Sequence, residues 1–254
     1  MLIFISLTVI PSRLATLWKC LKSLENQTVQ ADKIFLNVPI AYKRFTEVIS
    51  NEQLMPFKSN TIQIVRCEDY GPGTKLMGSL PQMLNEKGLV ILVDDDVQYK
   101  PYLIERLKET YEKTQKSCSF YVYGYTLKEG WLKRRRTTFK IGQGVDGFAM
   151  HTDMLSGLPA YFNEIKENQD LFYHDDVWIS YYLYLNGVDI INANSEGKCI
   201  YDIVSDPDAL SRLKGEQRRG LLIKRGLKYL RKKYEQPTLI KAIQQLRRAF
   251  EVKA

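Results

Sequence analysis

The chain carries a run of five apolar residues followed directly by three acids, Leu89-Val90-Ile91-Leu92-Val93-Asp94-Asp95-Asp96. A continuous apolar run rich in β-branched residues is typical of a strand buried on both faces, as in a parallel sheet covered by helices. The carboxyl edge of such a sheet is where open α/β proteins bind ligands. The run therefore predicts a buried strand that delivers three carboxylates to a ligand-binding edge.

The three adjacent carboxylates repel one another unless a positive charge lies among them. A divalent cation that holds an anionic ligand would supply that charge. The simpler alternative is a solvated turn that caps the following helix, because Asp is common in turns and at helix starts. Three acids in a row at a buried strand's edge favour the functional interpretation.

Strand-like and helix-like segments alternate on both sides of this run. We expect strands at 2–10, 33–38, 61–66, 119–125, 144–150 and 188–192, and helices at 14–26, 42–51, 74–85, 101–116 and 176–186. Such alternation is typical of βαβ units. It predicts an α/β fold with a mostly parallel central sheet flanked by helices, followed by a basic helical C-terminal extension.

The positive charge of the chain is concentrated at its C-terminal end. The net charge is +8, yet residues 212–254 hold 14 Lys/Arg and three Glu, a net +11, so the remainder carries −3. We expect an α/β domain at 1–213 and a basic amphipathic helical tail at 214–254. The tail could lie on an anionic membrane surface or pack its apolar stripe on the domain. Nucleic-acid binding is not expected, because aromatic residues are sparse among its basic ones.

The compartment is suggested by the cysteines and by the N-terminal segment. Cys20, Cys67, Cys118 and Cys199 are scattered without metal-ligand spacing and are typical of free thiols in a reducing environment. The apolar segment 1–11 lacks a basic leading region and a small-residue cleavage site, so we expect it to be a core strand. These features predict a cytoplasmic protein, soluble or peripheral on the cytoplasmic face of a membrane.

Three further polar segments could carry chemistry. Residues 8–13, Thr-Val-Ile-Pro-Ser-Arg, open a helix whose free amides suit an anion or a base, or are ordinary capping. In residues 69–75, glycines and Lys75 suit phosphate oxygens, although the P-loop spacing is absent and a plain turn is the alternative. Asp175 and Asp176 open another helix and suit a general base or a helix cap.

Together these segments resemble the GT-A class of nucleotide-sugar glycosyltransferases, in particular its small, inverting, family-2-like members with a DXD motif. The resemblance runs from Leu2 to about Leu213. It rests on the strand ending in Pro11-Ser12-Arg13, the segment 69–75, the acidic triplet and the late acidic pair. Residues 205–211 also look like the loop that closes over the donor in such enzymes.

The resemblance implies a role for each matching residue. Thr8, Pro11 and Arg13 would line the base and ribose of the nucleotide, and Asp69 and Lys75 would contact the base or the diphosphate. Asp94 would face the ribose and Asp95 the sugar. Asp96, with Asp94 as the second candidate ligand, would bind Mn²⁺ or Mg²⁺, since hard cations prefer carboxylate and phosphate oxygens. Asp176, or Asp175 as its competitor, would be the general base.

The implied reaction is the transfer of one sugar from a UDP- or GDP-sugar to a hydroxyl of a glycan or lipid-linked acceptor, with inversion. The chain departs from the family pattern because Asp175 stands where Glu usually precedes the base. It also lacks the QxxRW-type motif of processive synthases. Two alternatives remain: a sugar nucleotidyltransferase or pyrophosphorylase, and a non-catalytic module that binds sugar or nucleic acid. Against the first, no glycine-rich loop follows the first strand.

Overall fold

The computed structural model describes residues 1–129, 135–193, 199–203, 208 and 219–235. Its large sheet contains β1 (Leu2–Thr8), β2 (Lys33–Pro39), β3 (Ile62–Cys67), β4 (Gly88–Leu92), β6 (Ser117–Ser119), β9 (Phe148–His151) and β10 (Ile190–Asn192). Two smaller antiparallel pairs are β5 (Val97–Tyr99) with β11 (Ile200–Ile203), and β7 (Val122–Glu129) with β8 (Arg135–Gly142). The helices are α1 (Leu17–Glu25), α2 (Asn51–Leu54), α3 (Thr74–Met77), α4 (Leu80–Glu86), α5 (Leu103–Thr114), α6 (Leu158–Ile165), α7 (Gln169–Phe172), α8 (Asp175–Leu185) and α9 (Arg219–Tyr234).

The central sheet is mostly parallel, as the sequence predicts. Its strand order is β10-β6-β9-β4-β1-β2-β3, and only β9 runs antiparallel to its neighbours β4 and β6. Strands β1, β2, β3 and β4 are mutually parallel, so their carboxyl ends meet at one edge. This edge receives the acidic triplet after β4 and the two other polar segments that follow β1 and β3.

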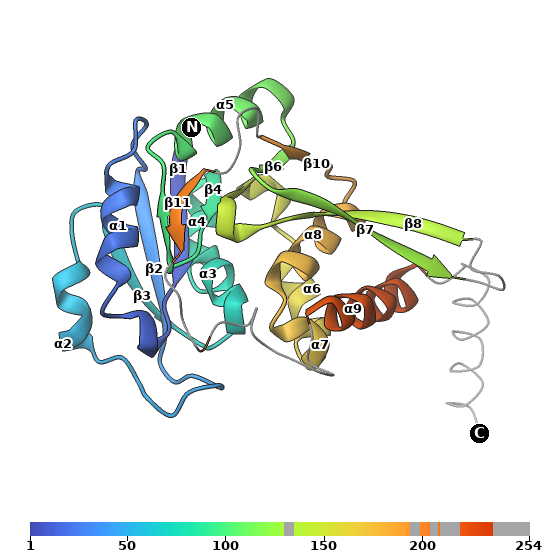
Figure 1. Cartoon of the computed structure of the whole chain (residues 1–254), viewed down its shortest axis with the longest axis horizontal. Coiled ribbons are helices and arrows are strands. Elements are labelled where there is room, and N and C mark those ends of the chain that lie inside the picture. Colours follow the sequence, from blue (N-terminus) through green and yellow to red (C-terminus); the bar gives the residue numbers. More distant parts are fainter. Residues whose placement is uncertain (130–134, 194–198, 204–207, 209–218, 236–254) are drawn as a thin grey trace.

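Each face of the sheet is covered by helices, which gives three layers (Figure 1). Alternate residues of β1 divide between the two layers because successive side chains of a strand point to opposite faces. Ile3 and Ile5 pack with α1 and α5, whereas Phe4 packs with α3, α4, α6 and α8. Every residue of β4 is buried, as expected for a strand covered on both sides.

The segment 42–51 is not the helix that its sequence suggests. Tyr42 donates from its hydroxyl to the Val9 carbonyl, and the Lys43 amide donates to Asp69, so both residues are held against the sheet edge. A helix begins only after Ser50, whose side chain and that of Gln53 form a capping box. The expected strand at 144–150 is also shorter, because Gly144–Asp146 forms a 3-10 turn, η5, before β9.

The described part of the C-terminal extension packs on the domain. Ile223, Leu227 and Leu230 of α9 are buried in the same core as α6, α7 and α8, and Leu222 is also buried. The expected division at residue 213 lies outside the described residues and stays a prediction. Within the described ranges, no helix combines the length and apolar composition needed to cross a bilayer.

Gly73 offers a test of how tightly the helical layer fits against the segment after β3. It lies in a 3-10 turn, η3 (Gly71–Gly73), and a β-carbon there would lie 2.5 Å from the ring of Trp178, which is fully buried in α8. Its φ of −65° suits alanine, so the clash alone should decide the effect. We expect Gly73→Ala to cost about 1–3 kcal/mol, which lowers Tm by roughly 2–12 °C in thermal unfolding.

The matched control is Gly220→Ala, because nothing lies within 4 Å of a β-carbon at that exposed helical position. It should leave Tm unchanged or raise it slightly. Equal Tm values for the two variants would contradict the close packing of Gly73 on Trp178.

Candidate functional site

A cavity of about 380 Å³ opens at the carboxyl edge of the parallel strands. Nine of the residues that the sequence singles out line it: Thr8, Arg13, Asp69, Lys75, Asp94, Asp95, Asp96, Asp175 and Asp176. Pro11 does not; it starts the 3-10 turn η1 (Pro11–Arg13), and Ile10 lines the cavity instead. The fold therefore brings segments from four separate parts of the chain to one concave site.

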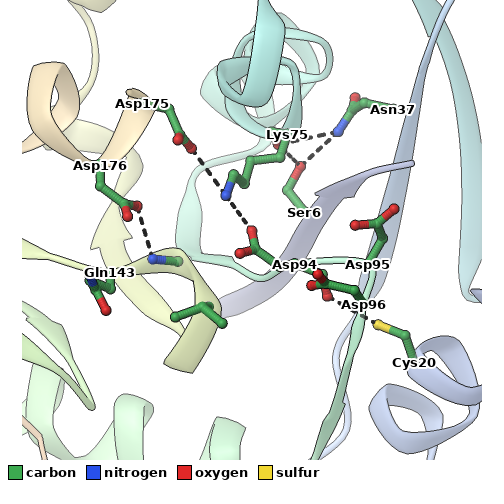
Figure 2. A network of polar contacts seen from close by, with 12 residues as sticks. Ser6, Cys20, Asn37, Lys75, Asp94, Asp95, Asp96, Gln143, Asp175 and Asp176 are labelled. Atoms are coloured by element: carbon green, nitrogen blue, oxygen red, sulfur yellow. Dashed lines mark hydrogen bonds and ion pairs between the residues drawn. The ribbon is translucent and has the colours of Figure 1, made fainter. Parts of the chain in front are cut away.

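Lys75 joins the two acidic clusters of the cavity. Its Nζ lies 2.5 Å from Asp94 Oδ1 and 3.0 Å from Asp175 Oδ2, and its side chain is only 5% exposed (Figure 2). Burial alone would lower the pKa of Lys75, but Asp175 and Asp94 raise it well above its ordinary value. Lys75 is therefore a permanent cation that holds the acidic triplet and α8 together.

A buried polar network fixes the backbone of Lys75 on the side that faces the sheet. Ser6 of β1 donates from its hydroxyl to the Lys75 carbonyl, and Asn37 of β2 donates from Nδ2 to the same carbonyl at 3.2 Å and to Ser6 Oγ at 2.9 Å. These side chains satisfy a carbonyl at the start of α3 that faces the sheet (Figure 2). The sheet thus sets the position of α3, and α3 sets the position of the ammonium group.

Arg13 pairs with the other two acids of the triplet. Its Nη1 lies 2.7 Å from Asp95 Oδ1 and 3.1 Å from Asp96 Oδ2. Asp95 is buried, and its Oδ2 has no hydrogen-bond partner among the described residues. The triplet therefore divides: Asp95 and Asp96 face Arg13 after β1, whereas Asp94 faces Lys75 and α8.

The ionisation of the triplet reflects this division. Burial would raise the pKa of Asp94, but Lys75 and Arg13 hold it below its ordinary value. For Asp96, burial together with the charges of Asp94 and Asp95 raises the pKa to about 7. At Asp96, burial and the neighbouring carboxylates therefore outweigh the attraction of Arg13.

Asp176 lies at the start of α8 and faces the cavity. Its Oδ1 accepts a hydrogen bond from the Gly144 amide at 3.0 Å, and its Oδ2 lies 3.4 Å from Arg219 Nη2. Burial and the neighbouring Asp175 raise the pKa of Asp176 to about 7. A carboxylate with a pKa near neutrality is suited to accept a proton at physiological pH.

Gly144 and Arg219 are site residues that the sequence reasoning missed. A β-carbon on Gly144 would lie 2.9 Å from Lys75 Nζ, 3.5 Å from Asp176 Oδ1 and 3.7 Å from Asp94 Oδ1, so this glycine borders both acidic clusters. The pair Gly142 and Gly144 is a signal that could have drawn attention to the segment. Nothing in the basic tail marks Arg219, which only the packing of α9 brings to the cavity.

The remaining predicted residues have structural partners as well as a place in the cavity wall. Thr8 donates from Oγ1 to the Asn37 carbonyl at 2.9 Å. Asp69 accepts from the amides of Lys43 and Gly71, at 2.6 and 2.7 Å. Of the expected donor-covering loop 205–211, only Asp208 lies within the described residues; it lines the cavity, and its carbonyl accepts from Arg44.

The donor set around the triplet suits a hard cation only in part. Seven aspartates but four Lys/Arg line the cavity, so an anionic ligand would meet an excess of negative charge. Among the described residues, no group of three or more His, Cys, Asp or Glu side chains is arranged to hold a metal. Asp94 and Asp96 are oxygen donors of the right chemistry, and further ligands would have to come from substrate and water.

Comparison with known proteins identifies the fold. The sequence matches no protein-family model and no curated protein. The structure resembles that of S. aureus TarS 1–349, with a TM-score of 0.50 and 14% sequence identity over 80% of this chain and 60% of that chain. This chain thus spans less than two thirds of the TarS fragment.

Two further structures resemble the chain more weakly. They are 4-diphosphocytidyl-2C-methyl-D-erythritol synthase (TM-score 0.48, 11% identity, 89% of this chain and 98% of that chain) and CMP:2-keto-3-deoxy-manno-octonic acid synthetase complexed with CTP (0.42, 10%, 74% and 87%). The likeness to TarS, at 14% identity, bears on the fold alone. The chain has a GT-A-like fold with a mostly parallel central sheet, and a fold by itself does not establish a reaction.

Lys75→Met should reveal how far the fold depends on the pairing of the two acidic clusters. Removing the cation leaves Asp94 and Asp175 without the charge between them, so we expect a loss of about 3 kcal/mol and a drop in Tm of roughly 6–12 °C. Adding Asp175→Asn should restore part of the loss, because one of the two repelling carboxylates is then neutral.

Lys33→Met is the matched control for that variant. Lys33 pairs with Glu86 at 2.6 Å, but both side chains are more than a third exposed, so its loss should cost less than about 1 kcal/mol. Equal destabilisation by the two Lys→Met substitutions would contradict a structural role for the buried pair.

Proposed function

We propose that the protein is an inverting glycosyltransferase that moves one sugar from a UDP- or GDP-sugar to a hydroxyl of a glycan or lipid-linked acceptor. The observation that carries this proposal is the meeting of two acidic clusters, one after β4 and one at the start of α8, across a single cavity in a GT-A-like fold. Sugar transfer needs both a place for a nucleoside diphosphate and a base for the acceptor. The two clusters offer one site for each.

The nucleotide would bind on the side of β1, β2 and β3. Tyr42 and Phe45 line this part of the cavity with aromatic surface for a base, and Arg13 supplies a guanidinium beside Asp95 and Asp96. Because Arg13 holds Asp95, we assign Asp95 to the ribose side. Asp94, which faces Lys75, is assigned to the diphosphate and sugar side, which exchanges the roles of Asp94 and Asp95 that the sequence resemblance implies.

A divalent cation is part of the proposal. Asp96 and Asp94 would hold Mn²⁺ or Mg²⁺ together with oxygens of the diphosphate, and the cation would offset the charge that builds on the leaving nucleoside diphosphate. Two features support this: the excess of aspartates in the cavity wall and the raised pKa of Asp96. Lys75 adds a fixed positive charge on the same side.

The acceptor would be activated by Asp176. Asp175 is engaged by Lys75, whereas Asp176 accepts from the Gly144 amide and Arg219 on the cavity wall. Asp176 would take the proton of the acceptor hydroxyl as its oxygen attacks the anomeric carbon. A base on the face opposite the leaving diphosphate gives inversion.

Asp96→Asn tests the proposed reaction and the metal together. The substitution keeps the shape of the side chain and removes its charge, so transfer and donor hydrolysis should fall on the order of 100-fold or more, with Tm preserved. Thermal shift against UDP- and GDP-sugars, with and without Mn²⁺, would identify the donor. Excess EDTA should abolish activity in the unaltered protein, and added Mn²⁺ should restore it.

Asp153→Asn is the matched control, because Asp153 is exposed and does not line the cavity. Full activity of Asp96→Asn would exclude the metal role. Release of pyrophosphate from a nucleoside triphosphate and a sugar phosphate would instead identify a nucleotidyltransferase. A donor-dependent thermal shift without turnover on any acceptor would favour the binding module.

The pH dependence tests Asp176 as the base. A base must be deprotonated, so kcat/KM should rise with pH through about 7 and level off above it. Asp176→Asn should lower kcat/KM on the order of 100-fold or more and remove this rise. A profile unchanged in shape would exclude Asp176 as the base.

A stability measurement provides the control for that variant. The pKa of Asp176 is raised to about 7 in the folded protein, against about 4 for an exposed Asp. Its favourable contribution to folding is therefore complete below about pH 4 and lost as pH rises to about 7. Asp176→Asn should raise Tm at pH 8 but not at pH 4, which would confirm that the variant is folded.

A further inference from the structure

One face of α9 carries a row of basic side chains that point away from the domain. Lys224, Lys228 and Lys232 follow one another at four-residue spacing and are all exposed. At 100° per residue, they lie with Leu221 and Tyr229 within an arc of about 140°. The buried residues of α9 occupy the opposite side of the helix.

The three lysines differ from the other cations of α9 in their partners. Arg225 lies within the same arc but forms two hydrogen bonds with Asp170, and Lys233 pairs with Glu164, so these two cations fasten the helix to the domain. Within the described part of the chain, no acidic side chain pairs with Lys224, Lys228 or Lys232. Their charge is therefore available to an external anionic partner.

The same face also exposes apolar surface. Leu221 is 42% exposed and Tyr229 is 36% exposed, although Leu222, Ile223, Leu227 and Leu230 of the same helix are buried. A leucine and a tyrosine between lysines are typical of a helix that lies in the headgroup region of a bilayer. Readers of single-stranded nucleic acid instead alternate basic residues with several stacking aromatics.

The charge distribution of the whole chain favours one orientation toward an anionic surface. Residues 212–254 carry +11, whereas the other residues carry −3. An anionic bilayer would therefore attract the end that bears α9 and repel the rest, which is how charge asymmetry orients a protein before contact. Gly220 accepts a hydrogen bond from Tyr125 of β7, so α9 is held in a defined place for this contact.

We propose that the face of α9 formed by Leu221, Lys224, Lys228, Tyr229 and Lys232 docks the protein on an anionic lipid bilayer. Arg219, at the first turn of the same helix, lines the cavity and lies 3.4 Å from Asp176. Docking through α9 brings the Asp176 side of the cavity to the membrane surface. This inference goes beyond the proposed function and does not depend on it, since vesicle binding can be measured without any turnover.

Co-sedimentation of the full chain with vesicles tests the proposal. The protein should bind vesicles in which a third of the lipid is phosphatidylglycerol, and not vesicles of phosphatidylcholine alone. A lysine near an anionic surface contributes roughly fivefold to binding, so Lys224→Gln, Lys228→Gln and Lys232→Gln together should weaken it on the order of 100-fold. Residues 236–254 add four Lys/Arg, so binding should weaken rather than vanish.

The matched control neutralises three exposed lysines elsewhere, Lys22→Gln, Lys58→Gln and Lys113→Gln, which gives the same net charge. It should bind the vesicles as the unaltered protein does. Equal weakening in the two triple variants, or no preference for the anionic vesicles, would overturn the proposal. Binding of RNA that depends on the three α9 lysines, without vesicle binding, would assign the face to nucleic acid instead.

Donor hydrolysis in solution separates this proposal from the proposed function. The α9 lysines do not line the cavity, so their triple variant should hydrolyse the donor at the normal rate. Loss of vesicle binding with hydrolysis intact would support docking. If the protein binds anionic vesicles but turns over no nucleotide sugar, the proposed transferase function is refuted and the docking proposal is still supported.

Discussion

The buried ammonium group of Lys75 is the interaction on which the fold and the cavity both depend. A lysine that is 5% exposed is tolerated only if its charge is matched. Two carboxylates match it, one close to Lys75 in the sequence and the other a hundred positions further along. Asp94 follows the central strand β4, and Asp175 starts α8. One cation therefore ties the sheet, the segment after β3 and the second helical layer together, so binding geometry and stability share the same contacts.

The fold and much of the cavity follow from local sequence patterns. The apolar run at 89–93 predicts a strand covered on both faces, and parallel strands necessarily gather the residues that follow them at one edge. This is why Arg13, Lys75 and the acidic triplet meet as expected. Gly144 and Arg219 could not be found in this way, because their position results from the packing of later elements against the sheet rather than from a strand end.

The pairing inside the acidic triplet was also beyond sequence reasoning. Three consecutive aspartates have the same chemistry, and only the backbone turn after β4 sends Asp94 toward Lys75 and Asp95 toward Arg13. The prediction of a helix at 42–51 was wrong for a similar reason. Its residues have helical spacing, but contacts of Tyr42 and Lys43 with the sheet edge hold the chain in another conformation.

Several carboxyl groups of the cavity lie in surroundings that disfavour their charged form. Asp96 and Asp176 resist ionisation, and a carboxylate oxygen of Asp95 is buried without a partner among the described residues. Neutral residues at these positions would favour folding, so their presence reflects a compromise between stability and function. This charge is what the divalent cation of the proposed function would offset.

The strand order has a consequence for synthesis of the protein on the ribosome. Strand β4 pairs with β1 on one side and with β9 on the other, and β9 is made only after residues 93–147. At about 5–20 residues per second, several seconds pass while an apolar strand has an open hydrogen-bonding edge. Such an edge is a template for pairing with other chains. The nascent protein therefore passes through a stage in which shielding by a chaperone would matter most, and β9 ends that stage by closing the sheet.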